Sequence, residues 1–190
     1  MLSRRLPRRR VTLGVMSEFS LPRHDAKTLI IMRHAEADWG LDDFNRPLTR
    51  RGHEQALSAG QWLVQQGFVP EMLVSSAALR TRQTTTWVSE ALGDKAPTAS
   101  LDERLYNAPS SALLSTINRA PQGVQALMLV AHLPGVQDAA LELARPDSDY
   151  EALMDASHGF SPSSVAVFDV FGDWSELTTA AAFLKAFKAF

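Results

Sequence analysis

The chain has 190 residues, 45% of them apolar and 21% charged, which is the composition of one ordinary globular domain with a substantial core. It contains no cysteine, which excludes disulfides, thiolate metal sites and a cysteine nucleophile and fits the reducing cytoplasm. The formal net charge is −2, but five arginines lie within the first ten residues. The remainder is therefore acidic, which disfavours a nucleic-acid-binding body.

The first 25 residues differ in composition from the rest of the chain. No acidic residue precedes Glu18, but no apolar segment follows the arginines that would complete a secretory signal. We expect a disordered basic arm over residues 1–25 or an extension upstream of a protein that begins at Met16, with an organellar presequence as the alternative. The domain is expected at 26–190, and no apolar run approaches the roughly 20 residues that cross a bilayer.

Strands and helices alternate along this domain. A first strand is expected at 28–32, followed by a helix at 50–66 with Thr49 as its N-cap and Gly67 as its C-cap. The later elements are expected, in chain order, as a strand at 72–74, a helix at 79–92, an irregular segment with room for a short strand at 97–106, a helix at 110–119, a strand at 126–130, a helix at 135–144, a strand at 164–171 and a helix at 177–190. The alternation predicts an α/β fold, a single three-layer α/β/α domain with a mostly parallel central sheet.

Chemically active side chains follow three of the expected strands. Arg33 and His34 come after the first strand. Arg80 lies just beyond the Ser-Ser end of the second, and His132 follows the third. Parallel strands bring their carboxyl ends to one edge of the sheet, where ligands bind, so these side chains are expected to converge. Two histidines and two arginines together describe an anion site with a nucleophile, which suits phosphoryl transfer.

Four short segments then occur in an order typical of a known family. They are Ile31-Met32-Arg33-His34-Ala35, Arg46-Pro47-Leu48-Thr49 with Gly52, the stretch from Ser76 through Arg80 to Gln83-Thr84, and Val130-Ala131-His132-Leu133-Pro134. In these segments the chain resembles the histidine phosphatase superfamily, also called the phosphoglycerate mutase-like family, and within it the SixA-type phosphohistidine phosphatases. Ala35 stands where many members carry glycine, and Arg46 departs from an asparagine of the broader superfamily in favour of the SixA-like branch.

The resemblance implies a role for each strand-end residue. His34 would be the nucleophile and become a transient phosphohistidine, for which its ring has to be neutral. Arg33, Arg46 and Arg80 would bind the phosphoryl oxygens. His132 would complete the oxyanion-binding shell and be protonated when phosphate is bound.

The acidic residues are assigned less firmly by the same resemblance. Asp43 matches a family position that would orient an arginine, with a solvated loop carboxylate as the equal alternative. Glu103 resembles the acidic residue of phosphoglycerate mutases and is the candidate general acid, with Glu36 as its competitor. Imidazole as a leaving group has less need of a dedicated acid than an alkoxide has.

A metal site is the main rival explanation for these histidines and the acidic loop. Asp38, Asp42 and Asp43 could be imagined as ligands together with His34 and His132. The loop lacks the ligand rhythm of an EF-hand, no two histidines have zincin spacing, and a pocket of arginines would repel a cation. We therefore predict no metal and no cofactor.

The number of residues between the second strand end and His132 gives information about the substrate. Family members that act on small molecules usually insert cap helices there, whereas only about fifty residues separate Arg80 from His132. A site without a large cap is open, which favours phosphohistidine on a phosphotransfer protein over a small phosphorylated molecule. The alternatives are a broad-specificity small-molecule phosphomonoesterase, a non-catalytic phosphate-binding module, and tethering to membrane or nucleic acid through the arm and the apolar C-terminal residues (Phe183, Leu184, Phe187 and Phe190).

Overall fold

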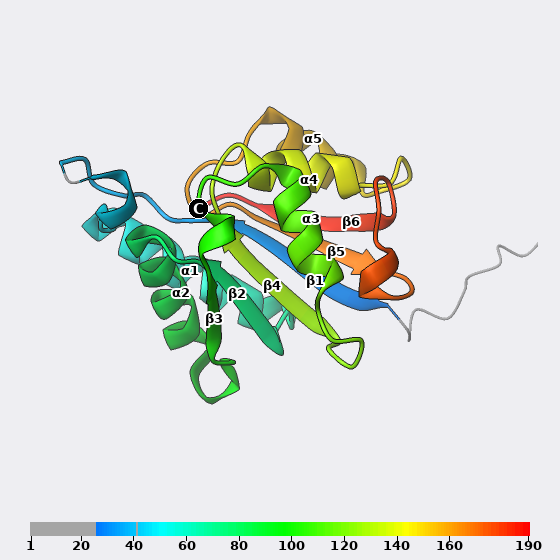
Figure 1. Ribbon diagram of the computed structural model, residues 1–190, viewed down its shortest axis with the longest axis horizontal. Helices are drawn as coiled ribbons and strands as arrows, with labels where there is room; N and C mark the ends of the chain where they lie inside the picture. Colours follow the sequence, from blue (N-terminus) through cyan, green and yellow to red (C-terminus); the bar gives the residue numbers. More distant parts are fainter. Residues whose placement is uncertain (1–25, 41) are drawn as a thin grey trace, which may run out of the picture.

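A computed structural model of the protein describes residues 26–40 and 42–190, and the predicted basic arm at 1–25 lies outside this range. Its centre is a six-stranded sheet in the order β3-β2-β4-β1-β5-β6 (Figure 1). The strands are β1 (Lys27–Arg33), β2 (Met72–Ser76), β3 (Ala99–Asp102), β4 (Ala126–Ala131), β5 (Val165–Val170) and β6 (Ala182–Lys188). Strands β1 to β4 run parallel, and β5 and β6 are antiparallel to their neighbours. The predicted α/β fold with a mostly parallel sheet is thus confirmed.

Five helices accompany the sheet. They are α1 (Arg50–Gln66), α2 (Leu79–Leu92), α3 (Ser110–Asn118), α4 (Gly135–Leu143) and α5 (Tyr150–His158). The predicted caps of α1 are present: the Thr49 side chain accepts a hydrogen bond from the Gly52 amide, and Gly67 ends the helix in the left-handed region at φ 75°. Helices α1 and α2 cover one face of the sheet and α3 and α4 the other, which gives the three predicted layers (Figure 1).

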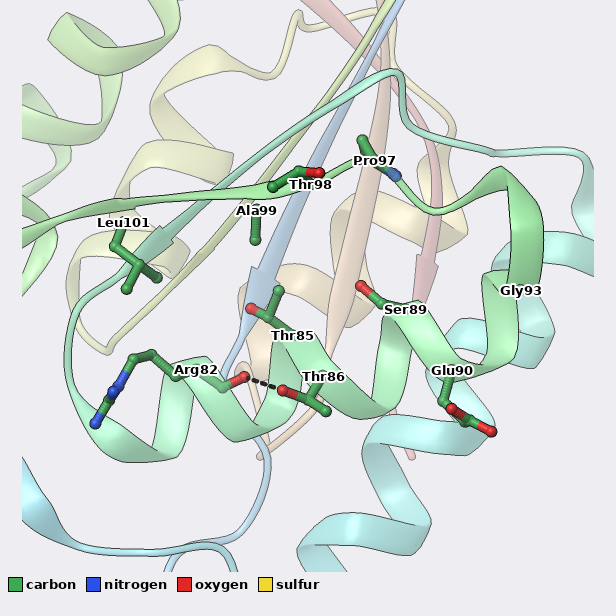
Figure 2. Close-up of a pocket in the computed structure, with 10 residues that line it drawn as sticks. All are labelled: Arg82, Thr85, Thr86, Ser89, Glu90, Gly93, Pro97, Thr98, Ala99 and Leu101. Carbon is green, nitrogen blue, oxygen red and sulfur yellow. Dashed lines mark hydrogen bonds between the residues drawn. The ribbon is translucent and has the colours of Figure 1, made fainter.

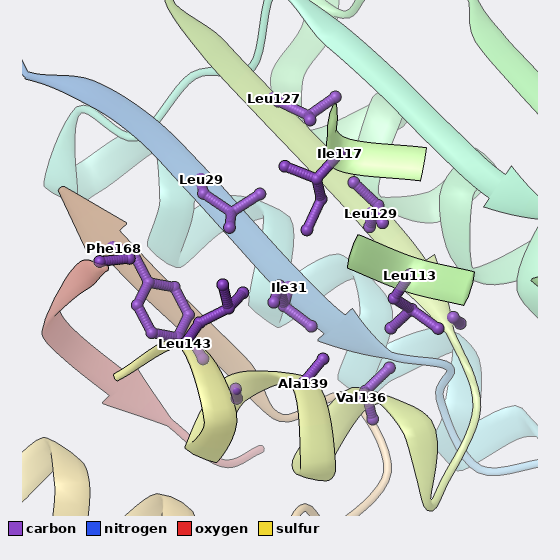
Figure 3. Packing of buried hydrophobic residues seen from close by; sticks show 14 of the residues in the cluster. Leu29, Ile31, Leu113, Ile117, Leu127, Leu129, Val136, Ala139, Leu143 and Phe168 are labelled. Carbon is purple, nitrogen blue, oxygen red and sulfur yellow. The ribbon is translucent and has the colours of Figure 1, made fainter. Parts of the chain in front are cut away.

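The core divides in two because neighbouring residues of a strand point to opposite faces. Leu29 and Ile31 of β1 pack with residues of α3 and α4, as Figure 3 shows. Ile30 and Met32 pack with residues of α1 and α2 on the other face. All four side chains are completely buried. The strand that carries the first chemical residues is therefore fixed from both sides, which suits a rigid platform for a site.

The predicted helix at 177–190 is wrong, because this segment contains the edge strand β6. Strand β6 pairs with β5 along its length, with an irregularity between Val167 and Phe168, and so covers an edge of β5 that would otherwise be unpaired. Ala182 and Leu184 are buried in the process. The tertiary pairing outweighs the helical propensity of an alanine-rich segment, and Ala182 and Leu184 become part of the core.

Two further elements sharpen the sequence prediction. The short strand for which residues 97–106 had room is β3, at one edge of the sheet. Helix α5 was not predicted, although Asp149 is an N-cap whose side chain accepts from the Ala152 amide. Within the described residues, no helix has the length and apolar character needed to cross a membrane.

Candidate active site

The register of the sheet brings the two histidines together. Arg33 lies opposite Ala131 in the parallel β1–β4 pair, and the His34 amide continues the ladder to the Ala131 carbonyl at 3.0 Å. His34 and His132 are each the first residue beyond this pair, and their ring centroids are 5.2 Å apart. Strand β2 lies on the other side of β4 and brings its last residue, Ser76, to the same edge. The predicted convergence of strand ends is present in the structure.

The hydrogen bonds of His34 fix which of its ring nitrogens carries the proton. Its Nδ1 lies 2.7 Å from the Ala35 carbonyl oxygen, so Nδ1–H is the donor and Nε2 carries the lone pair. Arg80 Nε lies 3.4 Å from this Nε2. The pKa of His34 is lowered from 6.5 to about 4, mainly by burial and also by the charges of Arg80, Arg33 and Arg46, while the hydrogen bond to Ala35 acts in the opposite direction. His34 is therefore neutral near pH 7.

His132 is more deeply buried, with 2% of its surface exposed. Its Nε2 lies 2.8 Å from Ser76 Oγ, and its Nδ1 has no hydrogen-bonding partner among the described residues. Burial, followed by the charges of His34 and Arg80, lowers the pKa of His132 to about 3. The Tyr106 ring stands edge-on to it at 5.5 Å.

Two arginines from the sheet and α2 face the histidines. Arg80, in the first turn of α2, is almost completely buried. Arg33 Nη1 donates to the Phe160 carbonyl oxygen at 2.6 Å, while its buried Nε has no partner among the described residues. Burial and the neighbouring charge of Arg80 lower the pKa of Arg33. Two interacting cations, with the Nε–H of Arg33 unused, favour binding of an anion.

A single carboxylate organises the loop side of the site. Asp43 accepts from Tyr106 Oη at 2.5 Å, Arg46 Nη1 at 3.0 Å, Arg80 Nη2 at 3.1 Å and Asn107 Nδ2 at 3.4 Å. Its backbone carbonyl also accepts from Arg80 Nη1. The hydrogen bond from Tyr106 and the charged partners hold the pKa of Asp43 well below its usual range, and Asp43 in turn raises the pKa of Tyr106. Asp43 thus contacts both Arg46 and Arg80, which is the arrangement that an orienting carboxylate requires.

Arg46 joins the site from this loop side rather than from a strand end. Its Nε donates to the Asp38 carbonyl oxygen at 2.6 Å, and its guanidinium lies 3.9 Å from the ring centroid of Trp39. Trp39 itself is 82% exposed. Gly52 of α1 supports the same loop, because a Cβ there would collide with the Glu36 carbonyl oxygen. We refer to Trp39, Asp43, Arg46, Tyr106 and Asn107 as the loop wall.

Comparison with known proteins places this geometry in a family. A family model described as histidine phosphatase superfamily (branch 1) matches residues 29–110. An uncharacterized protein of Mycobacterium tuberculosis is 34% identical over 159 residues, which are 82% of this chain and 98% of that protein. The chain belongs to the histidine phosphatase superfamily. It is accordingly a phosphatase.

Solved structures of this superfamily share the fold. A protein from Nakamurella multipartitia, assigned as a phosphohistidine phosphatase SixA, superposes with a TM-score of 0.74 at 31% identity over 86% of this chain and 96% of its own. One from Agrobacterium tumefaciens with the same assignment gives 0.70 at 30% identity over 86% and 97%. The predicted resemblance to the SixA-like group of histidine phosphatases is confirmed.

Within the described residues, neither candidate acid forms a hydrogen bond or ion pair with His34 or His132. Glu103 is exposed at the start of a short 3-10 helix (Glu103–Leu105), and within the described part of the chain it makes no hydrogen bond or ion pair with a residue of the site. Its role as general acid stays a prediction. Glu36 accepts from the Thr49 hydroxyl at 2.9 Å and lies 3.7 Å from Arg51, so its carboxylate supports the start of α1.

Three residues of this histidine phosphatase site were not singled out from the sequence. Tyr106 and Asn107 lie in the irregular segment before α3, and Asn107 has a positive φ of 48°. Ser76 was named as a strand end and as the start of a family-like segment, but was given no role. Its place at the same sheet edge as His132 could have been anticipated from the expected parallel sheet, but the two loop residues carry no periodic signal.

A groove elsewhere on the phosphatase is separate from these residues. It runs between α2 and the edge strand β3 and is lined largely by small polar side chains such as Thr85, Thr86 and Ser89 (Figure 2). Arg82 also lines it and is exposed, whereas Arg80 is buried on the side of the histidines. Among the described residues, no cluster of three or more histidine or acidic side chains is arranged to hold a metal ion.

Proposed function

We propose that this phosphatase works through a phosphohistidine formed on His34, without a metal, and that it acts on phosphohistidine in a protein. The observation that carries the proposal is the orientation of His34. Its Nδ1–H is tied to the Ala35 carbonyl oxygen, so its Nε2 lone pair is directed at the Arg80 side, where an anion would bind. A neutral ring with an unprotonated Nε2 is the form in which histidine is a nucleophile, and the bound anion would take the place of the Arg80 contact to that nitrogen.

The proposed reaction has two displacements at phosphorus. In the first, His34 Nε2 forms a bond to phosphorus while the bond from phosphorus to the substrate nitrogen breaks. The leaving imidazole departs neutral when its other ring nitrogen carries a proton, so the step does not depend on Glu103. In the second, water forms the new P–O bond, the P–Nε2 bond breaks, and inorganic phosphate leaves with His34 neutral again.

The arginines supply the electrostatic part of this reaction. Phosphoryl transfer spreads negative charge over three equatorial oxygens, and catalysis consists mainly of positioning and stabilising that charge. Arg33 Nε is a buried donor without a partner among the described residues, and Arg80 Nε donates to His34 Nε2. Arg46 would add a third cation from the loop wall. The same three positive charges would oppose a bound metal cation.

The proposed substrate class rests on the elements between Arg80 and His132. This interval contains the remainder of α2, β3, a short 3-10 helix, α3 and β4, all of which belong to the core layers. Within this interval, all of which the structure describes, no helix is left to form a cap, and an uncapped site gives little enclosure to a small ligand. The neighbours assigned as SixA phosphohistidine phosphatases support the same class. We also propose the cytoplasm as the location, because a chain without cysteine fits a reducing compartment.

The test compares two kinds of substrate on the purified full chain. One is a phosphotransfer domain carrying phosphohistidine, and the other is a panel of sugar phosphates and aryl phosphates. We expect a higher kcat/KM for the phosphohistidine protein, unchanged by addition of a chelator. Faster hydrolysis of a small phosphomonoester would overturn the substrate assignment, and loss of activity with the chelator would overturn the metal-independent scheme.

A further inference from the structure

The contact between Ser76 and His132 is buried and close. Ser76 is the last residue of β2, is completely buried, and places its Oγ 2.8 Å from His132 Nε2. Strand β2 pairs with β4, with Ser75 opposite Val130, so the two residues meet because of the sheet register. A buried hydroxyl of this kind needs a partner for its own proton and one for its lone pairs.

The direction of this hydrogen bond follows from the second partner of Ser76. The Ala78 amide, which can only donate, lies 3.4 Å from Ser76 Oγ. Within the described residues, His132 Nε2 is then the one acceptor within reach of the Ser76 hydroxyl proton. If Nε2 carried the ring proton instead, both the serine proton and His132 Nδ1 would be left buried without partners. The first arrangement leaves a single unpaired group.

We propose that Ser76 is a positioning residue that holds His132 in the tautomer with the proton on Nδ1, so that Nδ1–H donates to the transferring phosphoryl group. The inference rests on the proposed reaction at His34. The two histidines are then complementary: His34 is tied through Nδ1 and offers a lone pair at Nε2, while His132 is tied through Nε2 and offers a proton at Nδ1. One ring attacks phosphorus and its neighbour, 5.2 Å away, stabilises an oxygen.

The protonation state of His132 makes the choice of tautomer matter. Its pKa is lowered to about 3 by burial and by neighbouring charges, so near neutral pH the free enzyme holds a neutral ring with a single proton. The groups facing the ring are His34, Tyr106, Arg80, Arg33 and Asp43, of which only Asp43 favours protonation. A neutral ring in the wrong tautomer would present a lone pair to an anionic oxygen, which repels it.

Nuclear magnetic resonance of the imidazole nitrogens tests the proposal on the free protein. Long-range correlation spectra of isotope-labelled histidine distinguish Nδ1–H from Nε2–H rings. We expect Nδ1–H for His132 and also for His34 in the unchanged protein. In Ser76→Ala we expect His132 to lose this preference. An Nε2–H ring at His132 in the unchanged protein, or the same tautomer in Ser76→Ala, would overturn the proposal.

Ser75→Ala is the matched control. Ser75 is the adjacent, equally buried serine, and its hydroxyl donates to the Ser76 carbonyl oxygen at 3.0 Å rather than to a histidine. We expect kcat to fall roughly ten- to hundredfold in Ser76→Ala, the usual scale for losing a group that orients a functional histidine, and to stay near the unchanged value in Ser75→Ala. Ser76→Thr, which keeps the hydroxyl, should retain the tautomer and most of kcat. Equal kcat in both alanine variants would contradict the assignment.

The outcomes separate this inference from the proposed function. The tautomer is read without substrate, so it is unaffected by which phosphorylated compound the enzyme prefers. A His132 tautomer that depends on Ser76 supports the inference even if the preferred substrate is a small phosphomonoester. Conversely, rapid hydrolysis of phosphohistidine protein with an Nε2–H ring at His132 would leave the proposed function standing and overturn the inference.

Discussion

The strand-end residues and the loop wall are held in different ways. His34 and His132 extend paired, buried strands, and each ring has one nitrogen tied by a hydrogen bond. The loop wall depends on one carboxylate, Asp43, whose side chain is 44% exposed. The proposed reacting groups thus lie at the ends of paired, buried strands, and the proposed orienting groups lie in a loop, where sequence and conformation can vary. The difference predicts that changes at strand ends abolish the reaction whereas changes in the loop wall modulate it.

The largest effect is expected for His34→Gln. Loss of the proposed nucleophile should lower kcat by roughly 10³-fold or more, because no phosphoenzyme can form. His158→Gln at the exposed end of α5 is the matched control and should leave kcat unchanged. Steady-state hydrolysis, with circular dichroism to establish folding, measures both. Substantial activity in folded His34→Gln would show that the strand-end residues are not more important for the reaction than the loop wall.

Arg80→Ala should follow. It removes a buried donor beside His34 Nε2 and is expected to cost roughly 10²–10³-fold in kcat, as loss of an oxyanion donor does elsewhere. Arg82→Ala changes the same residue type two positions along α2, on the groove side, and should have no such effect. Similar losses in the two variants would mean that net charge, rather than placement of the guanidinium, determines the rate.

The pH dependence of the free energy of unfolding distinguishes the strand-end histidines from Asp43 of the loop wall, and it is measured without any substrate. The pKa of His34 is lowered to about 4 and that of His132 to about 3, from 6.5 in the unfolded chain. Between these values the unfolded chain binds more protons, so stability falls as pH drops below 6.5, by up to about 1.4 kcal/mol per pH unit for each histidine. The lowered pKa of Asp43 acts only below about pH 4, its usual range.

Urea denaturation across this pH range checks the prediction. His34→Gln should reduce the slope of unfolding free energy against pH by about half in the histidine window and leave the acid limb below it unchanged. An unaltered slope in His34→Gln would show that the strand-end histidines are not the groups that resist protonation.

A smaller loss is expected for Asp43→Asn. The change removes the charge that orients Arg46 and Arg80 and should lower kcat/KM about tenfold, the scale of one charge-assisted hydrogen bond. Tyr106→Phe should also lower kcat/KM. The double variant should lose little more than Asp43→Asn alone, because both changes remove the same contact. A rise in affinity for inorganic phosphate in Asp43→Asn would instead make Asp43 a competitor of the substrate.

The smallest effect is expected for Trp39, an exposed residue of the loop wall. Trp39→Ala removes the stacking on Arg46 and should change kcat/KM about two- to fivefold, the scale of an exposed cation–π contact. Trp39→Phe should restore most of it. A loss as large as that of Arg80→Ala would mean that the loop wall takes a direct part in the reaction.

The strand-end residues of the site could be predicted from the sequence because general rules of strand burial and sheet geometry determine where they lie. Buried strands are short apolar runs, and parallel strands necessarily share one edge, so Arg33, His34 and His132 could be brought together without a structure. Arg46 and Asp43 were reached only through the family resemblance. Their positions depend on a loop whose path is set by tertiary contacts such as that of Gly52 with Glu36.

The C-terminal segment shows the opposite case. An alanine-rich stretch with apolar residues at helical spacing predicts a helix, yet the open edge of β5 recruits it as β6. Tyr106 and Asn107 were missed for a related reason, since a positive φ and a hydrogen bond to a distant carboxylate leave no local pattern. The conformations of β6 and of the loop with Tyr106 and Asn107 depend on contacts with distant parts of the chain, so the local sequence could not predict them.

The most direct test of the central claim is isolation of the phosphoenzyme. Rapid quenching of the full chain with radiolabelled phosphohistidine protein should yield an acid-labile, alkali-stable adduct that mass spectrometry locates on His34 and that is absent from His34→Gln. An adduct located on His132, or full turnover by His34→Gln, would contradict the account.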